Sequence, residues 1–176
     1  RNRAGDFRLR PDCPLGLIMT DKRADIVWPL ILTVLVVLLF VTGAPTDTAF
    51  SWPDSPRHAL NGAFLLDFMR DRPLHDPTGY AYNYYAQYPA LTILFYPPLF
   101  YVLLAVFYAL FGVSQTTAIA AVCFCYAALA IGSYRLARFW LPALPAFGAA
   151  LILISAPEIA YWGRQVMLEI PSFALL

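Results

Sequence analysis

Two acidic residues lie at the borders of apolar segments, where a carboxylate could take part in a reaction. The first, Asp54, belongs to the segment WPDSPRHA at 52–59, which follows the first long apolar run. Its carboxylate could act as a general base for an acceptor hydroxyl or amine. It could also help to hold a divalent metal that binds a phosphate leaving group, although the sequence gives no set of metal ligands. We therefore expect Asp54 to be a catalytic residue.

The second acid, Glu169, lies in RQVMLEIP at 164–171, at the mouth of another apolar segment. Ionisable side chains in such places are costly and often functional, which makes Glu169 the second candidate catalytic residue. Three cationic or titratable residues are candidates for holding the substrate or its phosphate: Arg57, His58 and Arg164. The arginines suit this role because a guanidinium fork matches the oxygens of a phosphate.

The acidic residues also have a structural interpretation. Asp54 or Ser55 could cap the helix that follows them. Glu169 could pair with Arg164, or cap the helix that begins just after it. The residue types alone leave the catalytic and the structural interpretations open.

Other reactive side chains form less specific patterns. His58 and His75 have no spacing typical of a metal site. Cys123 and Cys125 lie two residues apart in an apolar helix and should point to different faces, so together with Cys13 they indicate neither a disulfide nor a zinc site. A cluster of tyrosines suits a membrane interface, or a surface on which a sugar could stack. The cluster comprises Tyr80, Tyr82, Tyr84, Tyr85, Tyr88 and Tyr96.

The composition indicates that a membrane helix bundle positions these residues. Of 176 residues, 60% are hydrophobic and 13% are charged, and the mean hydropathy is +0.62. Soluble domains carry about a quarter charged residues, and disordered chains are poor in the aromatic residues that make up 16% here. The net charge of +1 gives no reason to expect a nucleic-acid partner. We expect an all-α, polytopic membrane protein.

The basic residues predict the orientation of the first span. Six of the twelve precede the first apolar run: Arg1, Arg3, Arg8, Arg10, Lys22 and Arg23. The next 19 residues, 26–44, carry no charge. As a helix they would be about 28 Å long, enough to cross a bilayer core. Because basic segments stay in the cytoplasm, residues 1–25 are expected there, with 26–44 as the first membrane span.

Residues 45–92 are polar and rich in proline, and we expect them to form an external loop. Within the loop, a serine followed by a proline indicates the start of a helix over 55–70. This helix would be amphipathic and would lie on the membrane surface. Its apolar face would consist of Leu60, Ala63, Phe64 and Phe68. Other parts of the helical wheel carry Arg57, Asn61 and Arg70.

The 58 residues of segment 77–134 contain no Asp, Glu, Lys or Arg, and include two apolar blocks. If both blocks cross the membrane, Arg135 and Arg138 end outside. If only the second block crosses, they end in the cytoplasm, where basic residues are preferred. We favour this second topology, with a span at 116–136. The first block, 93–112, contains a Pro-Pro pair and would form a juxtamembrane or re-entrant helix.

The remaining sequence predicts a third span at 143–160, an external loop at 161–170 and the start of a further span at 171–176. In this topology Asp54 and Glu169 face the same side of the membrane, although 115 residues separate them. The chain does not begin with Met and stops within an apolar run. We therefore expect it to be the N-terminal fragment of a longer protein.

The order of these segments resembles the N-terminal module of the membrane-embedded GT-C glycosyltransferases. The likeness is greatest to bacterial relatives of the protein O-mannosyltransferases and to the aminoarabinose–lipid A transferases. In these families an external segment carries an Asp followed by a Glu, then two variable positions or an Arg, then an aromatic residue and an Ala. Segment 52–59 resembles this pattern. YPPLFY at 96–101 and LFG at 110–112 resemble a His/Tyr-Pro-Pro-Leu-Tyr segment and its closing Phe-Gly. MLEIP at 167–171 resembles the region of the second acid.

This resemblance implies an enzyme that takes a sugar from a polyprenyl- or dolichyl-phosphate donor. The acceptor would be a protein, lipid or glycan on the non-cytoplasmic face of a bacterial plasma membrane. The role of base or electrostatic anchor falls on Asp54, and that of the second acid on Glu169. The chain departs from the family pattern at two positions, and both concern metal use and catalytic equivalence. Ser55 stands where the family often has Glu, and the second acid is Glu169 where the family commonly has Asp.

Two other classes of protein fit the same residues. A transporter or flippase of a lipid-linked substrate would use the acids for binding only. Transporters usually place charges or broken helices near the membrane midplane, whereas the acids here lie at the membrane edges, which favours surface chemistry. In a non-catalytic membrane subunit, Asp54 would only cap a helix.

Overall fold

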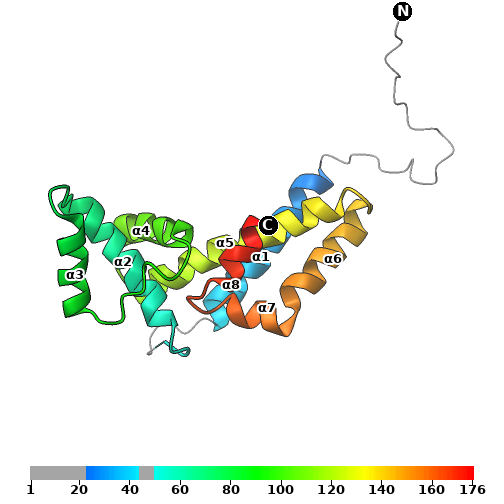
Figure 1. Ribbon diagram of the computed structural model, residues 1–176. Helices are drawn as coiled ribbons and strands as arrows, with labels where there is room; N and C mark the ends of the chain where they lie inside the picture. The colour runs from blue at the N-terminus through cyan, green and yellow to red at the C-terminus, as the bar shows by residue number, and fades with distance from the viewer. Residues whose placement is uncertain (1–22, 44–49) are drawn as a thin grey trace, which may run out of the picture.

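The structure, a computed structural model, describes residues 23–43 and 50–176, and every regular element in these ranges is an α-helix (Figure 1). In chain order the helices are α1 (Ala24–Gly43), α2 (Ser55–Asp71), α3 (Pro77–Gln87), α4 (Leu99–Phe111), α5 (Gln115–Ala137), α6 (Ala143–Ser155), α7 (Pro157–Trp162) and α8 (Glu169–Leu175). The expected all-α fold is thus confirmed for the described residues. Most of the basic segment 1–25, and residues 44–49 of the external loop, lie outside them.

Two helices, α1 and α5, are long and apolar enough to cross a membrane. They occupy the residues at which the first two spans were expected, 26–44 and 116–136. Along α1, Leu32 and Val36 are buried in the core, whereas large apolar side chains such as Ile26 are exposed. A helix that is apolar on its exposed side as well as its packed side suits a lipid environment.

The helices α1 and α5 pack against each other in opposite directions, so the start of α1 lies beside the end of α5 (Figure 1). An ion pair joins these ends, with 2.8 Å between Arg138 Nε and Asp25 Oδ1. The hydroxyl of Tyr134 donates a second hydrogen bond to the same carboxylate oxygen, at 3.0 Å. The ion pair therefore holds together two segments that are 113 residues apart in the sequence.

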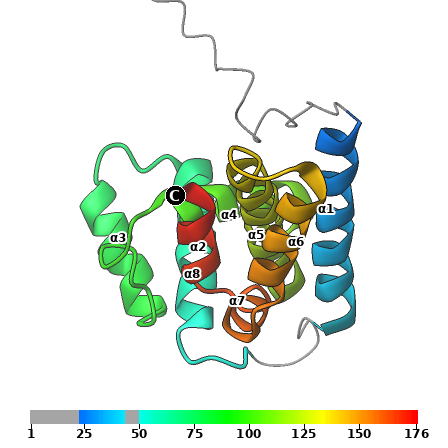
Figure 2. The same ribbon diagram turned by 90° about the vertical axis from the view of Figure 1, so that its right-hand side faces the viewer.

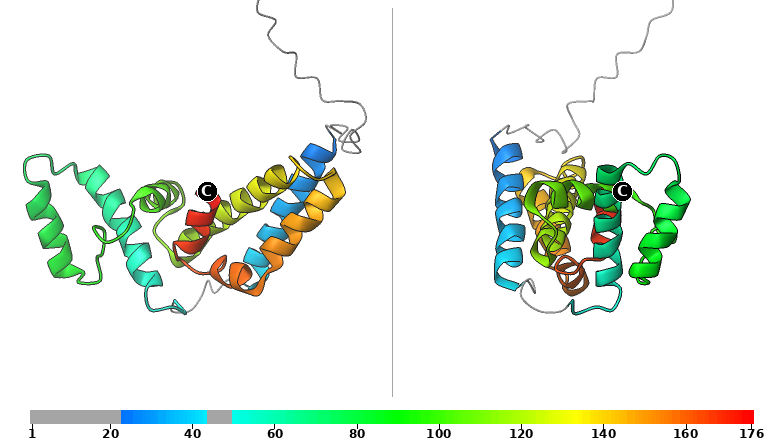
Figure 3. Two further views of the ribbon diagram at one scale, coloured as in Figure 1. Left: turned by 45° about the vertical axis from the view of Figure 1, so that its right-hand side comes forward. Right: turned by 90° about the vertical axis from the view of Figure 1, so that its left-hand side faces the viewer.

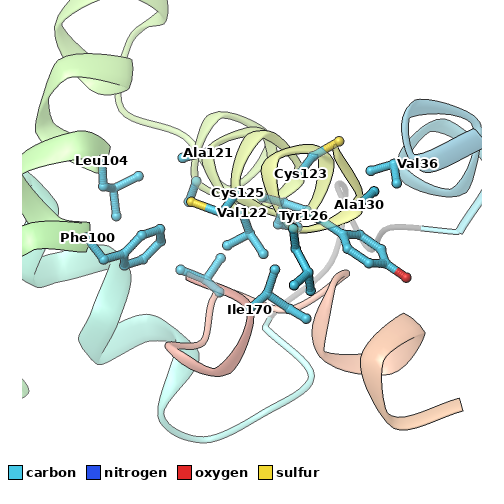
Figure 4. Close-up of a cluster of buried hydrophobic side chains, with 14 of the residues drawn as sticks. Val36, Phe100, Leu104, Ala121, Val122, Cys123, Cys125, Tyr126, Ala130 and Ile170 are labelled. Carbon is cyan, nitrogen blue, oxygen red and sulfur yellow. The ribbon is translucent and has the colours of Figure 1, made fainter. Parts of the chain in front are cut away.

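The hydrophobic core centres on α5, which contacts α1, α4, α6 and α8. In Figure 2, α5 and α6 lie between α1 on one side and α2 with α3 on the other. Fully buried small residues on α5, such as Ala121 and Ala130, leave space for the neighbouring helices. Figure 4 shows Cys125 on the side of Phe100 in α4 and Cys123 on the opposite side, as expected from their spacing.

The packed face of α2 differs from the expected one. We expected Asn61 to lie away from that face, but Asn61 is 0% exposed and His58 is 2% exposed, so this expectation was wrong. Both side chains find hydrogen-bond partners in the segment that leads into α4 and in α4 itself. Gly62, directly after Asn61, lets α2 and α4 approach closely, since a Cβ there would lie 2.5 Å from Leu104 Cγ. The helix thus packs on α4 through a partly polar face.

The expected external loop contains a further helix, α3, which two tyrosines attach to α2. The hydroxyls of Tyr80 and Tyr84 donate to Asp71 and Asp67, at 2.8 and 3.0 Å. Burial and the hydrogen bond to Asp71 raise the pKa of Tyr80 to about 12, and the pKa of Tyr84 is raised by the same two kinds of cause. These two members of the tyrosine cluster therefore hold α3 against α2.

The segment expected to form the third span, 143–160, is divided into α6 and α7 at Pro157. Proline cannot donate a backbone hydrogen bond, and it favours an extended preceding residue. Ala156 accordingly has φ −57° and ψ 132°. The helix break leaves the carbonyl of Ile154 free to accept a hydrogen bond from the buried hydroxyl of Tyr126. With 13 residues, α6 is about 20 Å long, which is shorter than a bilayer core.

Candidate functional site

The candidate residues gather at one end of the bundle, where α1 finishes, α2 begins and the segment 162–169 joins α7 to α8. We call this region the loop end; both views in Figure 3 show the three parts along the same edge of the molecule. The rings of Trp52 and Trp162 meet edge-on, with centroids 5.3 Å apart. The side chain of Arg164 packs against Gly43, the last residue of α1. These two contacts bring the segment of Asp54 to the segment that precedes Glu169.

At the start of α2, Asp54 and Arg57 form an ion pair, with 3.0 Å between Asp54 Oδ1 and Arg57 Nη1. The side chain of Arg57 is 52% exposed and that of Asp54 is 37% exposed, so both are partly accessible to solvent. Although Asp54 occupies the N-cap position, its backbone is helical and its side chain makes no capping hydrogen bond. The neighbouring Ser55 Oγ is buried and has no hydrogen-bond partner among the described residues. Neither residue therefore caps α2 through its side chain, and the carboxylate of Asp54 stays available for other contacts.

His58 lies one helical turn after Asp54, and its side chain belongs to the core. Its Nδ1 is 2.8 Å from the hydroxyl of Tyr101, and the ring of Tyr96 meets it edge-on at 5.0 Å. Burial lowers the pKa of His58 from its usual value, with a smaller opposing effect from Asp54, and so favours the neutral imidazole. This position is at odds with the phosphate contact that we expected for His58. The histidine instead fixes the first turn of α2 against α4.

Asn61 was missed by sequence reasoning as a residue that positions the site. Its Oδ1 accepts a hydrogen bond of 2.9 Å from the backbone N–H of Thr92, and its Nδ2 donates to the hydroxyl of Thr92 at 3.2 Å. The pair ties α2 to the segment before α4, 31 residues away in the sequence. The sequence contained one signal for this role. His58 and Asn61 are polar residues three positions apart, and Gly62 directly follows Asn61.

Glu169 is the first residue of α8, and its Oε2 is buried without a hydrogen-bond partner in the described part of the chain. No ion pair between Glu169 and Arg164 is present among residues 23–43 and 50–176, so the pairing considered above is not observed. The guanidinium of Arg164 instead donates from Nε to the carbonyl of Ala160 at 3.0 Å. No described hydrogen bond or ion pair joins Glu169 to Asp54 either.

A metal centre is not defined by the described residues, among which no three His, Cys, Asp or Glu side chains come together. His75 is exposed in the loop between α2 and α3. A divalent ion held by Asp54 would need ligands from the substrate or from residues outside the described ranges.

Three cavities lie away from Asp54. One of about 290 Å³ between α2 and α3 is lined by polar and aromatic side chains that include Asp67 and Asp71. One of about 340 Å³ lies between α3 and the segment 91–95. One of about 630 Å³ lies along α5 and α8. None of the three is lined by Asp54, Arg57 or Glu169.

The chain matches no protein-family model, no curated protein and no solved structure.

Proposed function

We propose that the protein is a membrane glycosyltransferase whose described residues form a GT-C-like N-terminal module. It would transfer a sugar from a polyprenyl- or dolichyl-phosphate donor to a protein, lipid or polysaccharide acceptor on the non-cytoplasmic face. The observation that carries this proposal is the accessible Asp54–Arg57 pair at the loop end. It places a carboxylate and a guanidinium side by side, and the carboxylate is not used for helix capping.

The proposed topology has the N-terminus in the cytoplasm and the loop end outside, in a plasma membrane that the resemblance suggests is bacterial. It is supported by the antiparallel packing of α1 and α5, with Asp25 and Arg138 paired at the end opposite to the loop end. If α1 and α5 both cross, their opposite directions require that α4 does not.

The proposed reaction is an inverting displacement at the anomeric carbon of the donor. The acceptor oxygen or nitrogen attacks that carbon, and Asp54 accepts the proton that the nucleophile loses. The bond between the anomeric carbon and the phosphate oxygen breaks, and the phosphomonoester leaves with the electron pair. Arg57 and Arg164 would stabilise the negative charge of this leaving group. His58 has no direct contact with substrate in this scheme.

Glu169 would act as the second acid at the same end of the bundle. A carboxylate oxygen that is buried without a partner is unfavourable, and a hydrogen bond or cation from bound substrate would relieve this cost. We therefore propose that Glu169 contacts the acceptor or the donor when substrate is present.

The proposal is tested by giving the full-length protein a polyprenyl phosphate that carries a radiolabelled sugar. Transfer of the label to an acceptor identifies an enzyme, whereas movement of intact donor across a vesicle membrane without transfer identifies a flippase. Absence of both activities, under conditions in which the protein is folded, points to a non-catalytic subunit. Asp54→Asn should abolish transfer, and Glu158→Gln, an exposed acid in α7, should leave it unchanged.

A further inference from the structure

Two glycines from different parts of the chain surround Arg164 at the loop end. Gly163, directly before it, lies against the ring of Tyr126 in α5, where a Cβ would be 2.5 Å from Tyr126 Cε1. Gly43, at the end of α1, faces the arginine itself, where a Cβ would be 2.7 Å from Nη1 and 3.4 Å from Cδ. The absence of a side chain at 163 lets the backbone approach α5. The absence of one at 43 leaves room for the guanidinium.

The environment of Arg164 suits a cation that also binds an anion. The C-terminal end of a helix carries partial negative charge, so the end of α1 favours a guanidinium beside Gly43. Only Nε makes a hydrogen bond within the described residues, to the carbonyl of Ala160. The side chain is half-buried, which limits its motion and leaves the Nη groups as donors for a ligand.

We infer that Gly43 is a positioning residue that holds the guanidinium of Arg164 ready for the phosphate group of a polyprenyl-phosphate ligand. This inference rests on the proposed function, since it assigns Arg164 to the phosphate of the donor. The arginine contacts the phosphate, and Gly43 acts only through the arginine. Gly163 sets the backbone from which the arginine extends.

The variant Gly43→Ala tests this role with little disturbance elsewhere. Among the described residues only Gly112 and Arg72 have positive φ, so the backbone at Gly43 accepts alanine. Alanine also has a higher helix propensity than glycine, and among the described residues the atoms nearest to its methyl group belong to the flexible arginine. Thermal stability should therefore be unchanged or slightly higher, whereas the affinity for phosphate should fall. Gly148→Ala in α6 is the matched control, because a Cβ there meets nothing within 4 Å.

The experiment measures binding of decaprenyl phosphate to the full-length protein in lipid nanodiscs, with decaprenol, which lacks the phosphate, as the comparison ligand. We expect Gly43→Ala to bind decaprenyl phosphate about tenfold more weakly, which corresponds to about 1.4 kcal/mol. Binding of decaprenol should not change, and Gly148→Ala should match the wild-type protein. In a protein that already carries Arg164→Ala, the change Gly43→Ala should have no further effect.

Wild-type affinity in Gly43→Ala would overturn the inference, and so would a tenfold loss that persists in the Arg164→Ala background. Loss of thermal stability in Gly43→Ala, or absence of phosphate-dependent binding in the wild-type protein, would overturn it as well. A failure of the proposed function can be distinguished from a failure of this inference. If the wild-type protein binds decaprenyl phosphate through Gly43 and Arg164 but transfers no sugar, the positioning role stands and the enzymatic activity does not.

Discussion

The hydrogen bond between His58 and Tyr101 gives a sharp test of how the candidate site is held. Tyr101→Phe removes one oxygen atom and keeps the shape of a side chain that is 0% exposed. Nδ1 of the buried His58, now 2.8 Å from that oxygen, would lose its partner. An unpaired buried polar group costs about 1–3 kcal/mol. For a chain of this size that loss corresponds to a fall in melting temperature of roughly 2–12 °C.

The assay is thermal unfolding of the full-length protein in detergent at pH 7.5, with Tyr82→Phe as the control because Tyr82 is largely exposed. The double variant His58→Phe/Tyr101→Phe tests whether the loss of stability comes from the unpaired imidazole nitrogen. If the cost arises from the unpaired imidazole nitrogen, replacing both partners should be less destabilising than the sum of the single changes. A fall for Tyr101→Phe no larger than that for Tyr82→Phe would refute the reasoning, and so would strict additivity in the double variant.

Three further predictions concern stability. Burial lowers the pKa of His58 in the folded protein, so as the pH falls His58 takes up a proton in the unfolded state before it does so in the folded state. The free energy of unfolding should therefore decrease as the pH falls below about 6.5. Denaturant titrations at several pH values should show this decrease in the wild-type protein and a smaller one in His58→Phe. Gly163→Ala should destabilise the fold by about 1–3 kcal/mol, since its methyl group would meet the ring of Tyr126, and thermal unfolding measures this effect. Arg138→Ala should lower the melting temperature by removing the ion pair that joins α1 to α5, whereas the exposed Arg135 should tolerate the same change.

The elements of the fold that depend on local composition were predictable from the sequence. The ranges 26–44 and 116–136 contain long uncharged apolar runs, and α1 and α5 lie there within a few residues. The start of α2 at Ser55 followed from the serine–proline pair. The break before Pro157 could also have been predicted, because the residue before a proline is disfavoured in a helix.

Other features depend on partners that are distant in the sequence. The buried face of α2 could not be assigned from its apolar residues, because the cost of burying Asn61 is offset by hydrogen bonds to Thr92. The proximity of Gly43 to Arg164 likewise appears only when α1 and the segment after α7 are packed together. Of the five candidate site residues, Asp54, Arg57 and Arg164 lie at the loop end, His58 is buried in the core, and Glu169 begins α8.

The most direct test of the central claim is the initial rate of sugar transfer by Asp54→Asn in the full-length protein. A general base contributes about 10²–10⁴-fold to the rate, so the variant should transfer labelled sugar from polyprenyl phosphate at least about a hundredfold more slowly. Its binding of the donor should be retained, and Glu158→Gln should transfer at the wild-type rate. Transfer by Asp54→Asn at the wild-type rate, with normal expression and folding, would contradict the assignment of Asp54 as the base.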